Sequence, residues 1–273
     1  MQLLESQALT NSESRSTLAF TATSGWGYPE WDRFISFDGR QIFHIGNPCE
    51  TCEFFFKRVS DRSVSSFEID RTRLALEAGL NSIDETAMAF SEVIPNGDYV
   101  VALFVAHLRQ AGSSVMPDYF SHEQRLAWPE YDRDETEIPT CTSYFRGESR
   151  QVGDQQMLFE FFVPLYDIGM LNRNRVDHYK QILLAGHRPT AIALSVLDVK
   201  SSMSYPRDNA GAEIEPEFPT HWCFANYLLD GHHKMMASHE TGKPISVLSF
   251  ISRDASWEQV DELMTTYTAM TPP

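Results

Sequence analysis

The sequence predicts an α+β protein built on a mixed β-sheet, and three observations support this. An Asp38-Gly39 pair separates two apolar-rich runs, as in a β-hairpin. In the second half of the chain, runs rich in β-branched residues alternate with segments of helical periodicity. Capping and helix-stopping residues lie between those segments. We therefore expect a β-rich N-terminal lobe over residues 1–150 and a mixed-sheet C-terminal lobe over residues 151–273.

Composition limits the function classes. The 273 residues include 22 Lys+Arg and 38 Asp+Glu, for a net charge of −16. This acidity argues against nucleic acid as a partner, because phosphate neutralisation needs clustered basic side chains. A local group of main-chain N–H donors can still bind a nucleotide. The start lacks a secretory signal and no apolar run reaches the roughly 18 residues of a membrane helix, so we expect a cytoplasmic protein without a membrane partner.

The N-terminal half contains few strong signals. Polar residues before Leu18 predict a loosely held arm. The runs 34–37 and 40–45 are the two strands of the predicted hairpin. Ser82 and Glu85 form a capping box that predicts a helix ending before Pro95. A near-continuous apolar run follows and predicts a buried strand over 99–108.

The second half is expected to alternate strands and helices. Its elements are a strand over 157–164, a helix capped by Asn174 and ended by Gly186, strands over 190–199 and 222–229, a helix to about residue 240, a strand over 245–251, and a last helix whose capping box is Ser256–Gln259.

The stretch most informative about chemistry is Asp230-Gly231-His232-His233-Lys234, at the junction of a strand and a helix. The first N–H groups of a helix lack intrahelical partners and lie at the positive end of its dipole, so they can bind phosphate. Gly231 lets a ligand approach the main chain, and the histidines and Lys234 add donors. Asp230 can hold a hydroxyl group or a metal ion. The same residues also fit a helix that Asp230 merely caps, with the other side chains in solvent.

This motif resembles the strand-DGHHR-helix element of nucleotide-binding members of the ParB/sulfiredoxin-like superfamily, such as the free serine kinases. Lys234 replaces the arginine, and Ala237 supplies the small residue that follows. Gly186–Thr190 before the motif and Gly242–Val247 after it are similar to the flanking segments of the family. The resemblance covers about a third of the chain, over residues 162–251, and implies a ParB/sulfiredoxin-like fold for the C-terminal lobe.

The resemblance also implies roles for the motif. Gly231, His232, His233 and Lys234 would bind the cofactor, which is ATP or another nucleotide with Mg²⁺, while Asp230 and His232 would be catalytic. A second carboxylate serves the kinases of the family, and Glu160 and Asp167 are the nearby candidates here. Sulfiredoxins carry a catalytic cysteine where this chain has His232, which disfavours sulfinic acid reduction.

Cys49 and Cys52 form a Cys-x-x-Cys pair on a predicted turn. Such a pair supplies two of the four ligands of a structural Zn²⁺ site, and Cys141, Cys223, His44 and His221 are candidates for the rest. Inert thiols and a redox pair are the alternatives, although Glu50 and Glu53 oppose the lowered thiol pKa that redox chemistry needs.

Two function classes follow from these features. The first is a nucleotide-binding protein, a phosphotransferase or nucleotide hydrolase, that acts on a small molecule or a protein and uses the motif as its phosphate site. The second is a non-catalytic binding or scaffold protein, in which a degenerate ParB-like fold carries a structural zinc site. The absence of a confident second carboxylate and the Lys-for-Arg change favour the latter.

Overall fold

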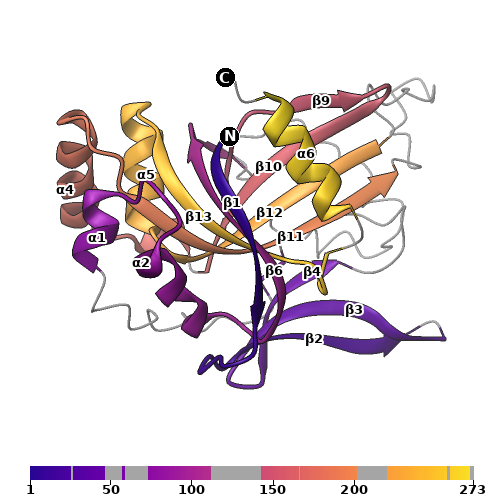
Figure 1. Cartoon of the computed structure of the whole chain (residues 1–273). Coiled ribbons are helices and arrows are strands. Elements are labelled where there is room, and N and C mark those ends of the chain that lie inside the picture. The colour runs from indigo at the N-terminus through magenta and orange to yellow at the C-terminus, as the bar shows by residue number, and fades with distance from the viewer. Residues whose placement is uncertain are drawn as a thin grey trace, which may run out of the picture.

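The computed structural model describes residues 1–25, 27–46, 57–58, 73–111, 143–165, 167–201, 220–256 and 259–270. These residues form an α+β fold with two β-sheets (Figure 1). The larger sheet is mixed and has nine strands, in the order β1-β6-β13-β11-β12-β10-β8-β7, with β9 paired to β10. The smaller sheet has the order β2-β3-β4-β5. The predicted fold class, an α+β protein with a mixed sheet, is confirmed.

The bounds of the elements are as follows. The strands are β1 (Gln2–Asn11), β2 (Leu18–Gly25), β3 (Tyr28–Phe37), β4 (Arg40–Gly46), β5 (Lys57–Arg58), β6 (Gly97–Ala106), β7 (Arg109–Ala111), β8 (Tyr144–Arg146), β9 (Arg150–Gly153), β10 (Gln156–Pro164), β11 (Thr190–Ser201), β12 (Thr220–Asp230) and β13 (Ile245–Ser252). The helices are α1 (Arg73–Ala78), α2 (Glu85–Met88), α4 (Arg173–Leu184), α5 (His232–Thr241) and α6 (Val260–Met270), with 3₁₀ turns η2 (Ala89–Val93) and η4 (Ile168–Met170).

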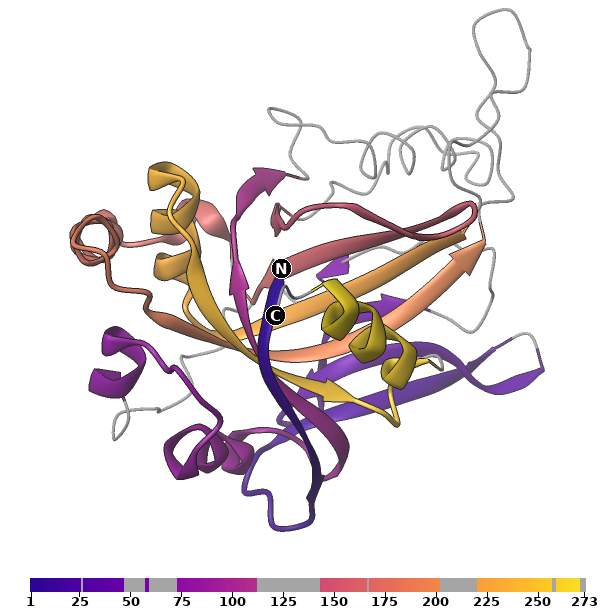
Figure 2. The ribbon, with the colours of Figure 1, turned by 45° about the horizontal axis from the view of Figure 1, so that its top comes forward.

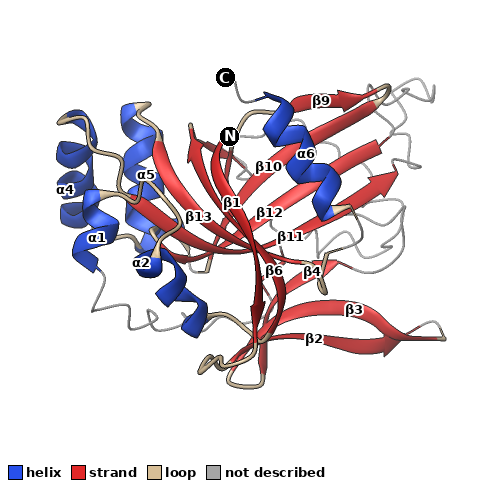
Figure 3. Ribbon diagram, in the orientation of Figure 1, coloured by secondary structure: helices blue, strands red, loops and turns tan. Residues whose placement is uncertain are grey.

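The large sheet has a hydrophobic core on each face. The small sheet, α1, α2 and η2 contribute to the core on one face, where Phe43 and Phe90 are buried. Helices α4, α5 and α6 pack on the other face, where Met235 and Tyr267 are buried. Figure 2 shows the hairpin of β2 and β3 on the side of the large sheet away from α5, and Figure 3 shows α6 far from the other helices. No helix within the described ranges has the length and apolar character needed to cross a bilayer.

The predicted hairpin is confirmed in the small sheet. Strands β3 and β4 are antiparallel, with Phe37 opposite Arg40. Between them, Asp38 and Gly39 have φ angles of 49° and 71°. A tight turn with two positive φ angles matches the twist of the flanking strands, which is why the Asp-Gly pair predicts it.

The expectation of a loosely held arm before Leu18 is wrong. Residues 2–11 form β1, which pairs with β6 along its whole length, from Gln2 opposite Val105 to Asn11 opposite Gly97. Most β1 side chains are exposed. The strand lies at the edge of the sheet and is held mainly by main-chain hydrogen bonds, so its side chains lack the apolar pattern by which a strand is recognised.

The predicted caps are misplaced, although the helices exist. Asp84, not Ser82, accepts the N–H groups that begin α2. In α4 the cap is Asn172 rather than Asn174. The hydroxyl of Ser256 accepts Leu197 N–H and donates to Ser252 O, and α6 begins only at Val260. More than one Asp, Asn or Ser occurs within four residues of each start, and sequence spacing alone does not choose among them.

The boundary expected at residue 150 does not divide the two sheets. Strands β1, β6, β7 and β8 precede it, yet they belong to the same nine-stranded sheet as β9 to β13. The first half of the chain therefore contributes both the small sheet and nearly half of the large one.

Candidate functional site

The Asp-Gly-His-His-Lys motif lies at the carboxyl ends of two neighbouring parallel strands in the interior of the large sheet. Strand β12 ends at Asp230, and β10 runs parallel to it, with Pro164 opposite Leu228. The chain leaving β10 therefore passes beside the start of α5, where Leu165 N donates to His232 Nε2 over 3.0 Å. Ligands of open α/β sheets commonly bind at the carboxyl ends of strands. The position of the motif thus fits a binding site.

Gly231 is required by its conformation and by its packing. Its φ of 103° lies in the left-handed region, which residues with a Cβ rarely adopt. A Cβ on Gly231 would lie 2.5 Å from the Cβ of Ala191 and 2.9 Å from its Cα. Helix α5 therefore starts in direct contact with β11, and glycine is the residue that allows this.

The start of α5 presents main-chain donors. The first intrahelical bond is donated by Met235 N to Gly231 O over 2.8 Å, so the N–H groups of residues 232–234 precede it. Helices α2 and α4 are capped by the side chains of Asp84 and Asn172. The N-cap residue of α5 is Gly231, which has no side chain to accept the first N–H groups of this helix.

Both histidines of the motif are uncharged and accept hydrogen bonds from the main chain. His232 is 6 % exposed, and its Nε2 accepts Leu165 N–H. His233 Nε2 accepts Asn172 N–H over 3.2 Å. Burial lowers the pKa of His232 to about 3 and that of His233 to about 4. Because each Nε2 accepts, the single ring proton lies on Nδ1, and neither ring brings positive charge to the site at neutral pH.

Lys234 is directed into the protein rather than toward solvent. Its Nζ donates to Asp230 Oδ2 over 2.6 Å and to Thr190 O over 2.7 Å, and it lies 5.6 Å from the centroid of the Tyr179 ring. The Lys234 side chain is 3 % exposed, whereas that of Asp230 is 34 % exposed. Burial raises the pKa of the Asp230 carboxyl, but the charge and hydrogen bond of Lys234 outweigh it, so the pKa lies below its ordinary value. An ionised, one-third exposed carboxylate therefore lies immediately before the start of α5.

The Asp230–Lys234 pair should contribute measurably to stability. We expect Lys234→Met to lower the free energy of unfolding by about 2 kcal/mol, less than for a fully buried pair because Asp230 is partly exposed. The double variant Asp230→Asn/Lys234→Met should recover most of the loss, since it leaves no unpaired charge. Urea unfolding of Lys234→Met, Asp230→Asn and the double variant measures the coupling energy between the two side chains. Additive losses of stability would contradict the expected coupling.

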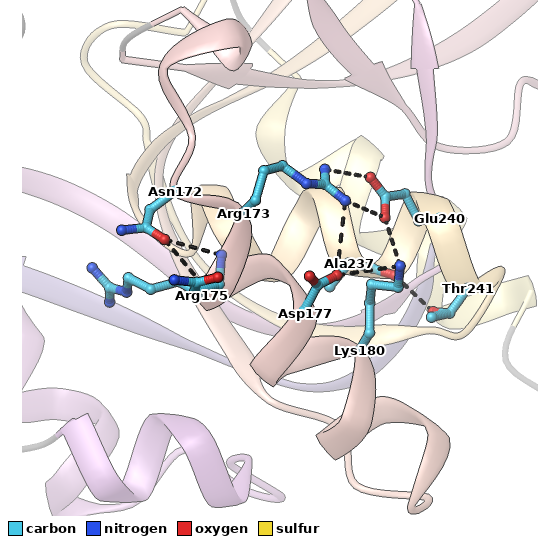
Figure 4. Close-up of polar contacts among 9 residues, drawn as sticks. Asn172, Arg173, Arg175, Asp177, Lys180, Ala237, Glu240 and Thr241 are labelled. Atoms are coloured by element: carbon cyan, nitrogen blue, oxygen red, sulfur yellow. Dashed lines mark hydrogen bonds and ion pairs between the residues drawn. The ribbon is translucent and has the colours of Figure 1, made fainter.

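An ion-pair network joins helix α4 to helix α5 (Figure 4). The Arg173 guanidinium donates to both carboxylate oxygens of Glu240, over 2.6 and 3.0 Å, and Lys180 Nζ donates to Glu240 Oε2 over 3.0 Å. Hydrogen bonding by Arg173 lowers the pKa of Glu240 to about 2. The network keeps Asn172, at the start of α4, close to His233.

Several residues near the motif had no local sequence signal for this position. Leu165, Asn172 and Tyr179 reach it through the pairing of β10 with β12 and the packing of α4. Thr190, in the flanking segment Gly186–Thr190, reaches it from the start of β11. Their contacts use mostly main-chain atoms. The register of the sheet, rather than any motif, brings them together.

The two candidates for a second carboxylate lie in different places. Glu160 is fully buried beside Phe224 of the neighbouring strand, six residues before Asp230 and so about 20 Å from it. It accepts the hydroxyl of Tyr267 over 2.7 Å. Asp167 follows β10 two residues after Leu165, near the motif, and accepts Gly169 N–H over 2.7 Å. Glu160 is thus too distant to share a substrate phosphate with Asp230.

The cysteine pair Cys49 and Cys52 lies outside the described residues, as does Cys141. Cys223 is buried in β12. Within the ranges that the structure describes, no three His, Cys, Asp or Glu side chains converge as a metal site would require. The zinc proposal therefore stays a prediction from the sequence.

No protein-family model, curated protein or solved structure matches this chain. Function is therefore inferred from the chemistry of the site itself.

Proposed function

We propose that this protein binds a nucleotide through its phosphates at the start of α5, as the resemblance to nucleotide-binding ParB/sulfiredoxin-like proteins implies. The observation that carries the proposal is the uncapped start of α5, which lies beside the carboxyl ends of β10 and β12. A helix, two strands, the helix that begins at the motif and a further strand follow one another from α4 to β13, and this order supports the proposal.

The electrostatics of the site indicate how a phosphate would be held. Asp230 and Lys234 neutralise each other, and both histidines are uncharged. The attraction therefore comes from the main-chain N–H groups of residues 232–234 and the dipole of α5. Arg175 is exposed on α4, near enough to His233 to lower the pKa of that ring, and adds positive charge at the rim.

For a phosphoryl transfer at this site, we assign the role of acting on the reacting groups to Asp230. Its carboxylate is ionised and one-third exposed, while Lys234 holds it in one orientation. It would hold Mg²⁺, which neutralises phosphate charge, or accept the proton of an attacking hydroxyl group. Lys234 keeps this carboxylate ionised, and the close contact of Gly231 with Ala191 fixes its position relative to α5.

A charge substitution at His233 tests the proposal. His233→Gln keeps an acceptor for Asn172 N–H and should bind nucleotide like the wild type. His233→Glu places a negative charge at the start of α5, where it satisfies the helix dipole and repels phosphate, so affinity should fall by more than about tenfold. Calorimetric titration with ATP, ADP and CTP, with and without Mg²⁺, measures both. Failure of the wild type to bind millimolar nucleotide would contradict the proposal.

A second candidate function is non-catalytic binding, which is favoured by the internal satisfaction of Asp230 and Lys234 and by the distance of Glu160 from Asp230. The two functions differ in turnover. A phosphotransferase or hydrolase should release phosphate or ADP from ATP, and Asp230→Asn should abolish this while preserving the affinity for nucleotide. A binding protein should show the affinity without turnover in either form.

A further inference from the structure

Lys234 holds the Asp230 carboxylate, so the groups that hold Lys234 decide where that carboxylate lies. The Lys234 ammonium has three N–H donors. It donates to Asp230 Oδ2 over 2.6 Å and to Thr190 O over 2.7 Å. Its third contact is with the ring of Tyr179, whose centroid lies 5.6 Å from Nζ. An ammonium at this distance from the face of an aromatic ring is attracted by the π electrons, so Tyr179 completes the surroundings of the ammonium.

The ring of Tyr179 is itself held at its hydroxyl end. Tyr179 lies in α4 and is 3 % exposed, and its hydroxyl donates to Glu77 Oε1 of α1 over 3.2 Å. Burial raises the pKa of Tyr179 to about 12, and the charges of Glu77 and Asp230 act in the same direction. The phenol is therefore protonated at neutral pH and donates to Glu77. This hydrogen bond fixes the direction in which the ring faces Lys234.

The end of α1 also holds Thr190, whose main-chain oxygen is the second acceptor of the ammonium. Leu80 N donates to Thr190 Oγ1 over 2.8 Å. Gly79, between α1 and Leu80, has a φ of 95°, and a Cβ there would lie 2.1 Å from Arg188 O. The turn after α1 is therefore in direct contact with the chain that enters β11. One short segment from the first half of the chain thus holds two of the three groups around the ammonium.

We propose that Tyr179 is a positioning residue of the site, whose ring, held by Glu77, keeps the Lys234 ammonium on Asp230. Each N–H of the ammonium then has a partner within the protein. A bound phosphate would meet the main-chain N–H groups of α5 and a fixed carboxylate rather than a mobile cation. The role of Tyr179 rests on the proposed nucleotide site only for its consequence in turnover, because the contacts themselves can be tested without nucleotide.

The pKa of the Asp230 carboxyl reports on the position of the ammonium. The titratable and charged groups around Asp230 lie on α1, α4 and α5, and they are Glu77, Arg175, Tyr179, His232, His233 and Lys234. Burial raises the pKa of Asp230, and the charge and hydrogen bond of Lys234 outweigh it. Loss of the Tyr179 ring should let the ammonium move away from the carboxylate, so the effect of burial would meet less opposition and the pKa of Asp230 should rise.

Carbon-13 NMR titration of the Asp230 carboxyl tests this role in the absence of nucleotide. The pKa of Asp230 should be higher in Tyr179→Leu than in the wild type, and Tyr179→Phe, which keeps the ring but not the hydroxyl, should lie between the two. Tyr267→Leu is the matched control, because Tyr267 is equally buried and its hydroxyl donates to Glu160, far from the motif. An unchanged pKa of Asp230 in Tyr179→Leu, or an equal rise in the control, would overturn the proposal.

A measurement on the wild type serves if Tyr179→Leu does not fold. The ring current of an aromatic side chain moves the resonances of protons over its face upfield. The Cε protons of Lys234, assigned by their absence from the spectrum of Lys234→Met, should therefore lie upfield of those of the exposed Lys243, in the wild type and in Tyr179→Phe. Lys234 resonances at the positions of an exposed lysine would overturn the proposal.

Turnover of nucleotide measures the consequence for the proposed function. Tyr179→Leu should lower kcat at least about threefold at an unchanged KM, because Asp230 acts in the reaction whereas the main chain binds the phosphates. A wild type that binds no nucleotide but shows the expected rise of the Asp230 pKa in Tyr179→Leu would contradict the nucleotide site and support the role of Tyr179. Wild-type kcat in Tyr179→Leu, with an unchanged Asp230 pKa, would contradict the role of Tyr179 alone.

Discussion

Gly231→Ala should destabilise the protein by about 2–5 kcal/mol, because it adds both backbone strain and steric overlap. The left-handed φ of 103° costs a residue with a Cβ about 1–2 kcal/mol. The new Cβ would also lie 2.5 Å from the Cβ and 2.9 Å from the Cα of Ala191. The Cα of Ala191 belongs to the main chain of β11, in the large sheet. Relief of the overlap therefore requires α5 to move away from β11, at a further cost of about 1–3 kcal/mol.

Gly186→Ala is the matched control. Gly186 has a φ of 90° at the end of α4, yet a Cβ there would meet no atom within 4 Å. This variant should therefore show only the conformational cost of about 1–2 kcal/mol. Urea unfolding of the two variants separates strain from overlap. Equal losses would mean that α5 does not contact β11 as closely as the distances indicate, and the placement of the start of α5 would then be wrong.

The strands and helices around the motif were predictable because each carries a local signal. Strand β11 is rich in β-branched residues, and α5 lies between Gly231 and Gly242, both with positive φ. Helix ends were less predictable, because neighbouring Asp, Asn and Ser residues compete for the cap and only the tertiary packing selects one. The whole of β1 escaped prediction because main-chain pairing with β6, rather than burial of its side chains, holds it.

The composition of the site was partly predictable, but the orientation of its side chains was not. The motif indicates donors at His232, His233 and Lys234, whereas the rings accept main-chain N–H groups and the ammonium is turned toward Asp230 and Thr190. These directions depend on Leu165 and Asn172, more than sixty residues away in the chain. A single sequence carries no local record of such pairings, since they follow from the parallel register of β10 and β12.

The burial of His232 predicts a loss of stability in mild acid. In the folded protein its pKa is about 3, whereas in the unfolded chain it is near the ordinary 6.5. Between these values the unfolded chain binds a proton that the folded protein does not, so stability falls as pH decreases through this window and is unaffected above it. The full difference corresponds to about 4–5 kcal/mol, at about 1.4 kcal/mol for each pH unit.

The window from pH 6.5 to 5 separates this effect from the protonation of carboxylates, which remain largely ionised there in both states. His233, whose pKa is also lowered, contributes equally to the wild type and to a His232 variant, so the difference between the two reports on His232. His232→Gln keeps an acceptor for Leu165 N–H but has no proton to gain, so its free energy of unfolding should vary less steeply with pH than that of the wild type, by the slope of about one proton. Urea unfolding at several pH values measures both slopes. If the slopes are the same, His232 is accessible to protons in the folded protein, and the imidazole would then be available to assist phosphate binding as a cation instead of serving as a neutral acceptor within the wall of the site.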